Sequence, residues 1–361
     1  MKLNFEIEYR TVWGESIGVN LGSNDSEPVM LQTEDGIVWR GSTEAKLPTG
    51  GVALLYRYGV WRDGKCVRRE QASMPHVLAT KGNVRTYNLK DSWHDAKRVA
   101  GVAVPVFSLR SNGSFGVGDF GDLKTMIDWT AMTGMKALQI LPINDTTITN
   151  TWTDSYPYNS ISIYAYHPQY VDLRQLPKLA DQDKAAAYEA KRQALNALTQ
   201  IDYEAVNNTK RAYLHDLFEQ EGAATLASTD YKTFFKNNDE WLIPYAVFSV
   251  LRDMYGTPDF SRWPEHSRFD KVAIAAFAAK KDNHHKVQFY CYVQFLLHTQ
   301  LLAASNYARE KDVILKGDIP IGISRASVEA WVEPFYFNMN GQAGAPPDPF
   351  SDKGQNWGFP T

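Results

Sequence analysis

Two acidic residues of this chain stand among Gly and Pro, directly after apolar runs. Asp318 lies in the sequence KGDIPI at residues 316–321, and Asp348 lies in GAPPD at residues 344–348. In (β/α)8-barrel enzymes, the loops that follow the strands hold the groups that contact substrate. Both carboxylates are therefore candidate substrate contacts, and they need strands and helices that bring them to one face of the protein.

A glycine-rich loop at residues 116–121 offers a different chemistry. Its sequence GVGDFG matches G-x-G-x-x-G, follows an apolar run and precedes a helical pattern, as a dinucleotide-binding loop does. However, residues 110–115 separate it from the predicted strand, and Asp119 puts a carboxylate where phosphates would lie. The alternative is a structural turn that leads into a helix, with Asp122 as the N-cap before Leu123.

Aromatic residues make up 13% of the chain, with ten Trp and nineteen Tyr. Sugar rings stack their C–H faces on aromatic rings, so this composition suits a carbohydrate ligand. The alternative is that Trp and Tyr fill cores and interfaces. Composition alone does not decide between the two interpretations.

The bulk properties indicate an ordinary soluble protein. A chain of 361 residues with 44% hydrophobic and 22% charged residues suits two or three domains. The net charge of -3 favours neither nucleic acid nor an anionic membrane as partner. Cys66 and Cys291 lie in dissimilar segments without a CxxC motif, so we expect no disulfide, metal site or cofactor. Without a signal peptide pattern or a membrane-spanning apolar run, we expect a cytoplasmic protein.

Residues 1–95 indicate an all-β domain. Short runs that alternate apolar and polar residues recur at 3–9, 17–21, 38–40, 52–60 and 84–89. Turn signals separate these runs at residues 22–25, 34–36, 63–65 and 81–83. This spacing predicts a β-sandwich, and a polar connector at residues 91–98 follows it.

From about residue 100 the pattern changes to strand, loop and helix. Strands are predicted at residues 102–109, 137–143 and 313–318, a helix at 123–132, and mostly helical structure from 175 to about 308, including an amphipathic run at 284–307. Residues 96–361 therefore fit the first strands of a (β/α)8 barrel with a helical insertion at about 175–285. A doubly wound sheet is the competing architecture.

A series of motifs carries a resemblance to a known family. In order along the chain they are FSLRSNGSFGVGDFGDL at 107–123, LQILPIN at 138–144, DSYPYNS at 154–160, KGDIPI at 316–321, SVEAW at 327–331, APPD at 345–348 and GQNWG at 354–358. Together they resemble the 4-α-glucanotransferases (amylomaltases or disproportionating enzymes) of glycoside hydrolase family 77. The DSYPY variant and the amino-terminal β-domain resemble its disproportionating-enzyme-2-like branch.

This resemblance implies retaining transfer of α-1,4-glucan segments between maltose, maltooligosaccharides or glycogen-like glucans. Such a mechanism uses two carboxyls about 5 Å apart, one as nucleophile and one as acid. In the family these groups follow the fourth strand and later strands, so we expect none of them before Thr361. The sequence LRDM at 251–254 lies in the helical insertion and is not assigned a catalytic role. We therefore expect the chain to be inactive without the missing carboxy-terminal half of the barrel.

The resemblance also implies one side of a glucan-binding cleft. Tyr158 resembles an aromatic residue of the donor site, and Asp318 a carboxylate that binds sugar hydroxyls there. Asp348, Gln355 and Trp357 resemble a mobile loop over the acceptor side, and the implied set of substrate-binding residues also includes Asn144. Alternatively, Tyr158 belongs to the core and Asp348 caps a turn after Pro347, while a lone carboxylate such as Asp318 at the end of a buried strand is costly without a partner.

The amino-terminal domain resembles a family 20 starch-binding module through DGIVW at 35–39 and LYRYGV at 55–60. The usual stacking tryptophans are replaced, so the remaining candidates for starch binding are Trp13, Trp39 and Trp61. A packing role for this domain is the alternative. For the whole chain, the competing functions are a non-catalytic α-glucan-binding protein and a nucleotide-dependent enzyme that uses the loop at 116–121.

Overall fold

The computed structural model describes residues 1–22, 26–46, 53–70, 75–80, 84–93 and 99–361. The chain forms two compact units, Met1–Arg98 and Val99–Thr361. The predicted turns at residues 23–25 and 81–83, the start of the run at residue 52 and the connector at 94–98 lie outside the described residues. Each unit is described by itself.

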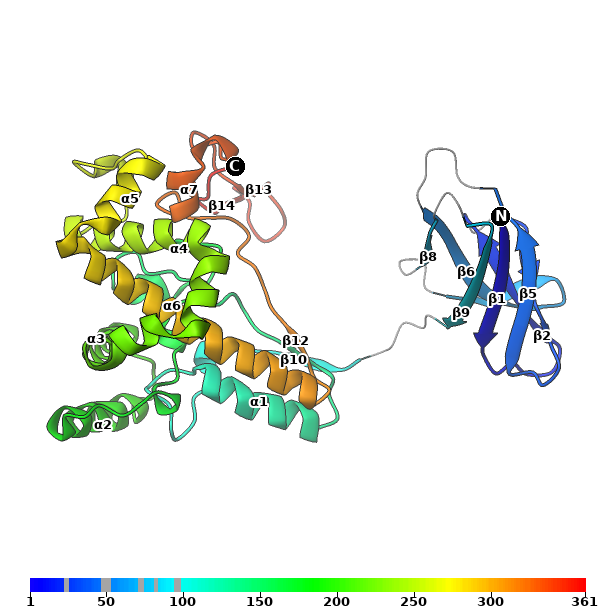
Figure 1. The fold of residues 1–361 in the computed structure, drawn as a ribbon, viewed down its shortest axis with the longest axis horizontal. Helices are drawn as coiled ribbons and strands as arrows, with labels where there is room; N and C mark the ends of the chain where they lie inside the picture. The colour runs from blue at the N-terminus through cyan, green and yellow to red at the C-terminus, as the bar shows by residue number, and fades with distance from the viewer. Residues whose placement is uncertain (23–25, 47–52, 71–74, 81–83, 94–98) are drawn as a thin grey trace. The chain divides into compact units, whose positions relative to one another are not determined.

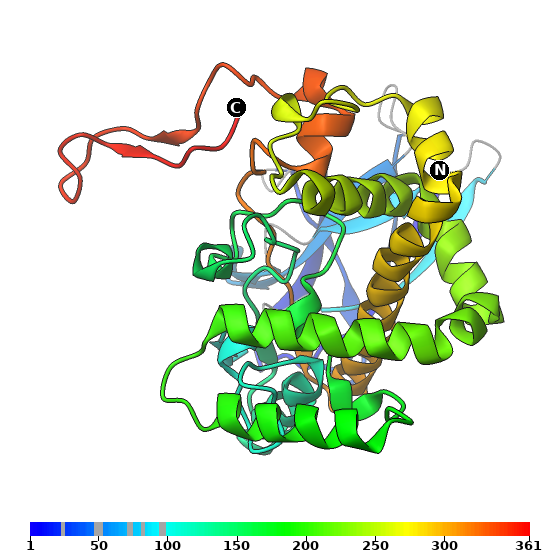
Figure 2. The ribbon, with the colours of Figure 1, turned by 90° about the vertical axis from the view of Figure 1, so that its left-hand side faces the viewer.

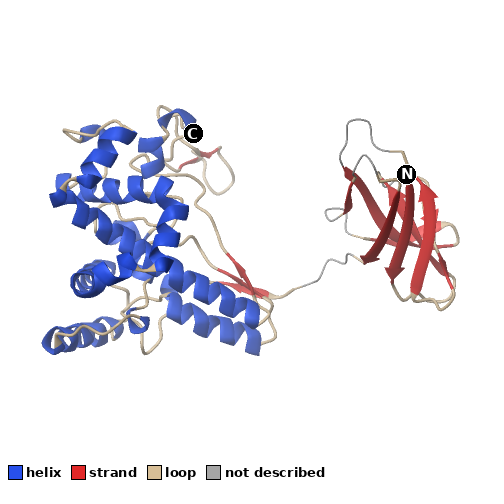
Figure 3. Ribbon diagram, in the orientation of Figure 1, coloured by secondary structure: helices blue, strands red, loops and turns tan. Residues whose placement is uncertain are grey.

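The first unit consists of strands (Figures 1 and 3). They are β1 (Lys2–Glu8), β2 (Glu15–Leu21), β3 (Val29–Met30), β4 (Gln32–Thr33), β5 (Val38–Glu44), β6 (Ala53–Arg62), β7 (Lys65–Arg69), β8 (His76–Ala79) and β9 (Thr86–Ser92). One sheet has the order β4-β5-β1-β9, and the other has the order β3-β2-β6-β7 with β8 paired to β6. The pairing of β1 with β9 is parallel, whereas β1 pairs antiparallel with β5.

The core of the first unit lies between these two sheets. Alternate residues of β1 point inward, so Leu3, Phe5 and Ile7 are buried together with residues of β2 and β6. This period of two is the expected consequence of strand geometry. The polar residues of β1 that alternate with these three point away from the core.

The tryptophans of the first unit have different environments. Trp39 is buried and donates its indole N–H to the carbonyl of Tyr9. Trp61 is buried, and its ring lies so close to Gly59 that a Cβ there would come within 2.5 Å of it. Only Trp13, in the turn between β1 and β2, exposes its whole side chain among these three candidates. Trp39 and Trp61 therefore do not offer a free ring face to a sugar.

The second unit contains a parallel sheet of three short strands, in the order β10-β11-β12. These strands are β10 (Gly101–Ala103), β11 (Ala137–Gln139) and β12 (Ile314–Lys316). In register, Val102 pairs with Leu138, and Leu138 pairs with Leu315. Because the strands are parallel, the loops that follow all three leave the same edge of the sheet.

The strands of this sheet are shorter than the apolar runs that predict them. The run at residues 102–109 predicts one strand, but β10 ends after three residues and a 3-10 turn follows at Val106–Ser108. Pro105 accounts for the difference, because proline has no N–H for the ladder and has a fixed φ. In the run at 137–143, β11 is likewise followed by a proline, Pro142.

Helices make up most of the second unit (Figure 3). They are α1 (Phe120–Met132), α2 (Gln182–Asn196), α3 (Tyr203–Ala227), α4 (Thr229–Tyr255), α5 (Lys271–Ala279), α6 (Lys281–Glu310) and α7 (Val328–Val332). Further 3-10 turns lie at Trp152–Ser155, Pro168–Tyr170, Leu173–Gln175, Phe260–Arg262 and Pro334–Tyr336, and a hairpin pairs β13 (Gly344–Ala345) with β14 (Gln355–Asn356). None of the described helices is long and apolar enough to cross a membrane.

Helix α1 begins three residues earlier than the sequence predicts. Its N-cap is Asp119, which accepts hydrogen bonds from the amides of Gly121 and Asp122. Asp122, predicted as the N-cap, is instead the third helical residue, and its carboxylate accepts from the Asp119 amide. The reciprocal pair is a capping box, which satisfies amides that the first turn leaves free. The prediction of Asp122 as N-cap is therefore wrong.

Candidate functional site

The loops that follow β11 and β12 meet through a tyrosine and a carboxylate. The hydroxyl of Tyr158 donates a hydrogen bond to Oδ2 of Asp318 at 3.0 Å, and Oδ1 of Asp318 accepts from the Ile319 amide. Burial, and then the bond to Asp318, raises the pKa of the Tyr158 hydroxyl. The phenol therefore remains a hydrogen-bond donor at neutral pH, and the half-exposed carboxylate keeps lone pairs for a ligand hydroxyl.

An aromatic surface adjoins this pair. The ring of Tyr156 lies with its centroid 5.7 Å from that of Tyr158, and 56% of Tyr156 is exposed. Exposed rings beside a hydrogen-bonding carboxylate suit a neutral ligand that has both hydroxyl groups and apolar C–H faces. The arrangement can bind such a ligand, and it contains no nucleophile paired with a general base.

Asp154 shapes the loop that carries Tyr158. Its carboxylate accepts hydrogen bonds from the backbone amides of Ile148, Thr149 and Asn150 and from the Thr149 hydroxyl. Asp154 is itself 5% exposed. A buried carboxylate with several donors stabilises one loop conformation, because each donor would otherwise lose its bond to water.

Asn144 lies at the base of the same loop. It forms an isolated antiparallel bridge with Tyr166, and its side-chain amide donates to the carbonyl of Ile163 at 2.8 Å. The next residue, Asp145, bonds through its backbone to Ala165 and Ile161. Asn144 thus joins the two ends of the loop, and among the described residues its side chain forms no hydrogen bond with Tyr158 or Asp318.

The other three predicted contacts lie in the hairpin of β13 and β14, which extends away from the helices (Figure 2). Oδ1 of Asp348 accepts from the amides of Phe350 and Ser351, both at 2.8 Å. Oε1 of Gln355 accepts from the indole N–H of Trp357 at 3.0 Å, and 41% of Trp357 is exposed. Asp348 therefore caps its own turn, while Gln355 and Trp357 form a pair on the hairpin stem.

Arg325 fastens the base of this hairpin to the rest of the second unit. Its guanidinium donates to the carbonyls of Met339, Gly341 and Gly358. Phe359 is 6% exposed and packs against Gly322, where a Cβ would come within 2.9 Å of the ring. The stem is thus fixed, whereas Phe350 at the tip is 98% exposed.

The loop at residues 116–121 has a structural role in this fold. The amides of Gly121 and Asp122, which would face a phosphate, already bond to Asp119. A Cβ at Gly118 would lie 2.0 Å from the carbonyl of Val106, so the glycine permits a close backbone approach. These contacts account for Gly118 and for the Asp119 carboxylate without a nucleotide.

Arg252 and Asp253, from the LRDM sequence, belong to a structural ion cluster. Both Arg252 and Arg211 bind Asp253, and Tyr290 donates its hydroxyl to the same carboxylate. Although burial opposes it, the two guanidinium groups hold the pKa of Asp253 below its usual range. The carboxylate is therefore ionised and engaged with three side chains.

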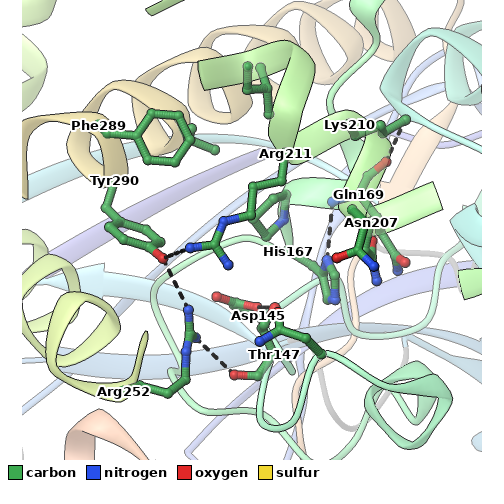
Figure 4. A pocket seen from close by; sticks show the side chains of 15 residues that line it. Asp145, Thr147, His167, Gln169, Asn207, Lys210, Arg211, Arg252, Phe289 and Tyr290 are labelled. Atoms are coloured by element: carbon green, nitrogen blue, oxygen red, sulfur yellow. Dashed lines mark hydrogen bonds between the residues drawn. The ribbon is translucent and has the colours of Figure 1, made fainter. Parts of the chain in front are cut away.

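A small pocket lies near this cluster, between α3, α4, α6 and the loop after β11 (Figure 4). Its cavity of about 40 Å³ has room for a few water molecules. His167 and Gln169 line it, and Nε2 of His167 and Oε1 of Gln169 have no partner among the described residues. Burial lowers the pKa of His167, which therefore stays neutral. None of the six predicted glucan contacts lines this pocket.

Sequence reasoning missed the buried polar residues that hold the loops. Lys210, Gln294 and Gln300 are 1%, 1% and 5% exposed, and all three bond to backbone atoms between residues 166 and 172. A polar side chain within the apolar face of a long helix is the signal that finds them, because burial without a partner is costly. Gln294 and Gln300 both occur in the amphipathic run at 284–307.

The solved structures that the chain resembles in fold are amylomaltases, which are TIM-barrel proteins. An amylomaltase from Streptococcus agalactiae in complex with acarbose matches with a TM-score of 0.62 and 24% identity, over 73% of this chain and 53% of that chain. Amylomaltase from Corynebacterium glutamicum matches with a TM-score of 0.57 and 19% identity, over 96% and 47%. At these identities the likeness establishes the fold alone.

Sequence comparison gives the family. The sequence pattern of 4-alpha-glucanotransferase matches residues 104–361. The 4-alpha-glucanotransferase DPE2 of Oryza sativa subsp. japonica is 42% identical over 318 residues, which are 88% of this chain and 32% of that protein. A 4-alpha-glucanotransferase of Chlamydia muridarum is 32% identical over 291 residues, 80% of this chain and 54% of that protein. The chain belongs to the 4-alpha-glucanotransferase family, and it spans about a third to a half of the length of these relatives.

Proposed function

We propose that these 361 residues supply the glucan-binding part of a 4-α-glucanotransferase that acts on maltose, maltooligosaccharides or glycogen-like glucans. One observation carries the proposal: Tyr158 and Asp318, from the loops after two neighbouring parallel strands, form a hydrogen-bonded pair at 3.0 Å. Parallel strands present their following loops at one edge, which is where barrel enzymes bind substrate. Family membership supports α-1,4-glucans as the class of substrate.

In this proposal Asp318 binds the substrate and is not the nucleophile. Transfer breaks one α-1,4 bond and forms another with retention, which requires two carboxyls about 5 Å apart across the bond. Asp318 is committed to Tyr158 and to the Ile319 amide, so it is suited to accept a hydrogen bond from a sugar hydroxyl. The ring of Tyr156 supplies the apolar contact.

Two finer assignments belong to the same proposal. The three parallel strands are the first strands of a (β/α)8 barrel, and helices α2 to α5, within residues 175–285, form its insertion. Gln355 and Trp357, on the hairpin held by Arg325, contact glucan on the acceptor side, and the protein acts in the cytoplasm. These assignments rest on the family and on the order of the motifs.

Titration of the chain with maltotriose by isothermal calorimetry tests the proposal. We expect saturable binding. We expect Asp318→Ala to weaken it without changing the loop that carries Tyr158, because Asp154 holds that loop. Thr299→Ala, an exposed site on α6, is the matched control and is expected to bind like the wild type. In the same samples we expect no release of glucose and no longer oligomers. Wild-type protein that does not bind maltotriose contradicts the proposed function.

A second candidate function is supported by one observation on the first unit. Trp13 is fully exposed in a turn that is closed by the bond from the Glu15 amide to the Val12 carbonyl. An exposed indole on a closed turn is suited to stack on a sugar ring, so the first unit is a candidate non-catalytic starch-binding module. Trp13→Ala is expected to reduce retention on insoluble starch, and Val12→Ala on the same turn is the control. Equal retention of both variants contradicts this candidate.

A further inference from the structure

The segment at residues 166–172 is mostly buried but belongs to no strand. It follows the loop that carries Tyr158 and contains the 3-10 turn Pro168–Tyr170. The hydrogen bonds of this turn satisfy only some of the backbone groups of the segment. Buried backbone N–H and C=O groups require partners. In a sheet a neighbouring strand would supply these partners, whereas here side chains of α3 and α6 supply them.

Gln294 of α6 binds the first residue of this segment at two points. Its Oε1 accepts from the Tyr166 amide, and its Nε2 donates to the Tyr166 carbonyl, both at 2.8 Å. This pattern reproduces the pair of bonds that one residue exchanges in an antiparallel ladder. Because Gln294 is 1% exposed, water cannot replace it.

Gln300 repeats this arrangement at the other end of the segment. It accepts from the Asp172 amide at 2.8 Å and donates to the Asp172 carbonyl at 2.9 Å. Between the two ends, Nζ of Lys210 donates to the carbonyls of Gln169 and Val171, at 2.6 and 2.8 Å; the Gln169 contact is visible in Figure 4. We call Gln294, Gln300 and Lys210 the backbone clamp.

The spacing of the clamp explains the shape of the segment. Gln294 and Gln300 are six residues apart, as are their partners Tyr166 and Asp172. Six residues of α-helix advance about 9 Å, whereas six residues of strand would advance about 20 Å. The turn at Pro168–Tyr170 shortens the segment, so that both glutamines can reach their partners.

The clamp also contacts the base of the Tyr158 loop. Gln294 donates to the Tyr245 hydroxyl at 3.3 Å, and that hydroxyl donates to Oδ2 of Asp145 at 2.7 Å. Asp145 and Tyr166 lie on opposite sides of the loop base, where Asn144 bridges to Tyr166. One buried side chain of α6 thus touches one side of the base directly and the other through Tyr245.

We propose that Gln294, Gln300 and Lys210 are positioning residues, which hold the loop base so that Tyr158 meets Asp318 in the geometry that binds glucan. The effect on glucan affinity rests on the proposed function, whereas the effect on the segment itself does not. The clamp acts through backbone position, and its members do not touch the ligand.

Hydrogen exchange and calorimetry on the full chain test this proposal. Gln294→Met and Gln300→Met keep the length of the side chain and remove the amide, and Gln288→Met on the same helix is the control. We expect each clamp variant to speed exchange across residues 161–172 by about tenfold, as the loss of buried hydrogen bonds implies. We also expect the dissociation constant for maltotriose to rise by about fivefold or more, because a looser loop must be ordered on binding.

Gln294→Glu provides a pH-dependent readout. A side chain that only filled space at this position would not give one. A protonated glutamic acid can accept from the Tyr166 amide and donate to its carbonyl, whereas the ionised form cannot donate. Burial raises the pKa of a carboxylic acid, so this change occurs at higher pH than in water. We expect protection near wild-type level at pH 5 and its loss at pH 8, after correction for intrinsic exchange. This variant also serves if Gln294→Met does not fold.

The possible results separate this inference from the proposed function. If both methionine variants exchange at the same rate as Gln288→Met, the backbone clamp does not hold the segment. Faster exchange with unchanged maltotriose affinity overturns the positioning role. If the wild type does not bind maltotriose, the proposed function and the link to glucan fail together, and the exchange data alone decide whether the clamp holds the segment.

Discussion

The hydroxyl of Tyr158 lies 3.0 Å from a carboxylate oxygen of Asp318, although 160 positions separate the two residues in the chain. Their loops follow β11 and β12, which are paired in parallel register. The pair is the one contact among the described residues that unites two of the predicted glucan-binding side chains from different strands. It gives a direct test of the site.

Tyr158→Phe removes one hydroxyl and leaves the ring in place. We expect the dissociation constant for maltotriose to rise three- to tenfold, about the effect of one ordinary hydrogen bond. Asp318→Asn should weaken binding at least as much, because an amide offers only one acceptor oxygen to Tyr158 and the ligand. Calorimetry on both single variants and the double variant gives the coupling between them. Strictly additive effects would show that the pair does not act as a unit.

Asp119→Ala should destabilise the second unit. The change removes the N-cap of α1 and one of the partners of Arg174, which Asp119 binds at 2.8 Å. We expect the free energy of unfolding in urea to fall by about 1–2 kcal/mol. Asp119→Asn is the matched control, since it keeps an acceptor for the helix amides and should lose less. A larger loss for asparagine than for alanine would contradict the capping role.

Arg325→Met should free the hairpin without unfolding the second unit. The guanidinium holds three carbonyls at the hairpin base, and methionine keeps part of the side-chain volume without any donor. We expect faster hydrogen exchange in residues 339–358 and lower fluorescence anisotropy of a probe at the hairpin tip. The midpoint of thermal unfolding should change by only a few degrees, about what 1 kcal/mol produces in a domain of this size. Unchanged exchange in the hairpin would refute the anchoring role.

Protonation of Asp253 should lower the stability of the second unit in acid. Its pKa is lowered in the folded protein by Arg252 and Arg211, although burial opposes them. A group with a depressed folded pKa stabilises the fold above its unfolded pKa, about 3.9 for Asp, and this contribution is lost as pH falls through the folded value. In Asp253→Asn we expect lower stability at pH 7 and a shallower decline below about pH 4. Urea unfolding at pH 7 and pH 3 measures both, and parallel pH curves would contradict this role.

The sequence predicts the local elements well where one period dominates. Alternation in the first 95 residues predicts the strands around Leu3 and Val60, and the run at 284–307 predicts most of α6. Errors occur where a single residue changes the local geometry. Pro105 ends β10 early, and Asp119 replaces Asp122 as the cap of α1.

The sequence nominates residues for the candidate site but does not say which of their side chains meet. The motifs select Tyr158, Asp318, Asp348, Gln355 and Trp357, yet they do not say which side chains meet. In the fold the exposed Asp348 accepts hydrogen bonds from amides of its own turn, the alternative that the sequence left open, while Asp318 meets Tyr158.

What the sequence determines by itself is what short-range physics controls: strand alternation, the helical period, the family motifs and their order. The tertiary structure decides which buried polar groups satisfy one another, since that depends on helices brought together from distant parts of the chain. Gln294 holding the backbone of Tyr166, 128 residues away, is such a case. Trp39 and Trp61 are another, because packing buries rings that composition alone could assign to a sugar.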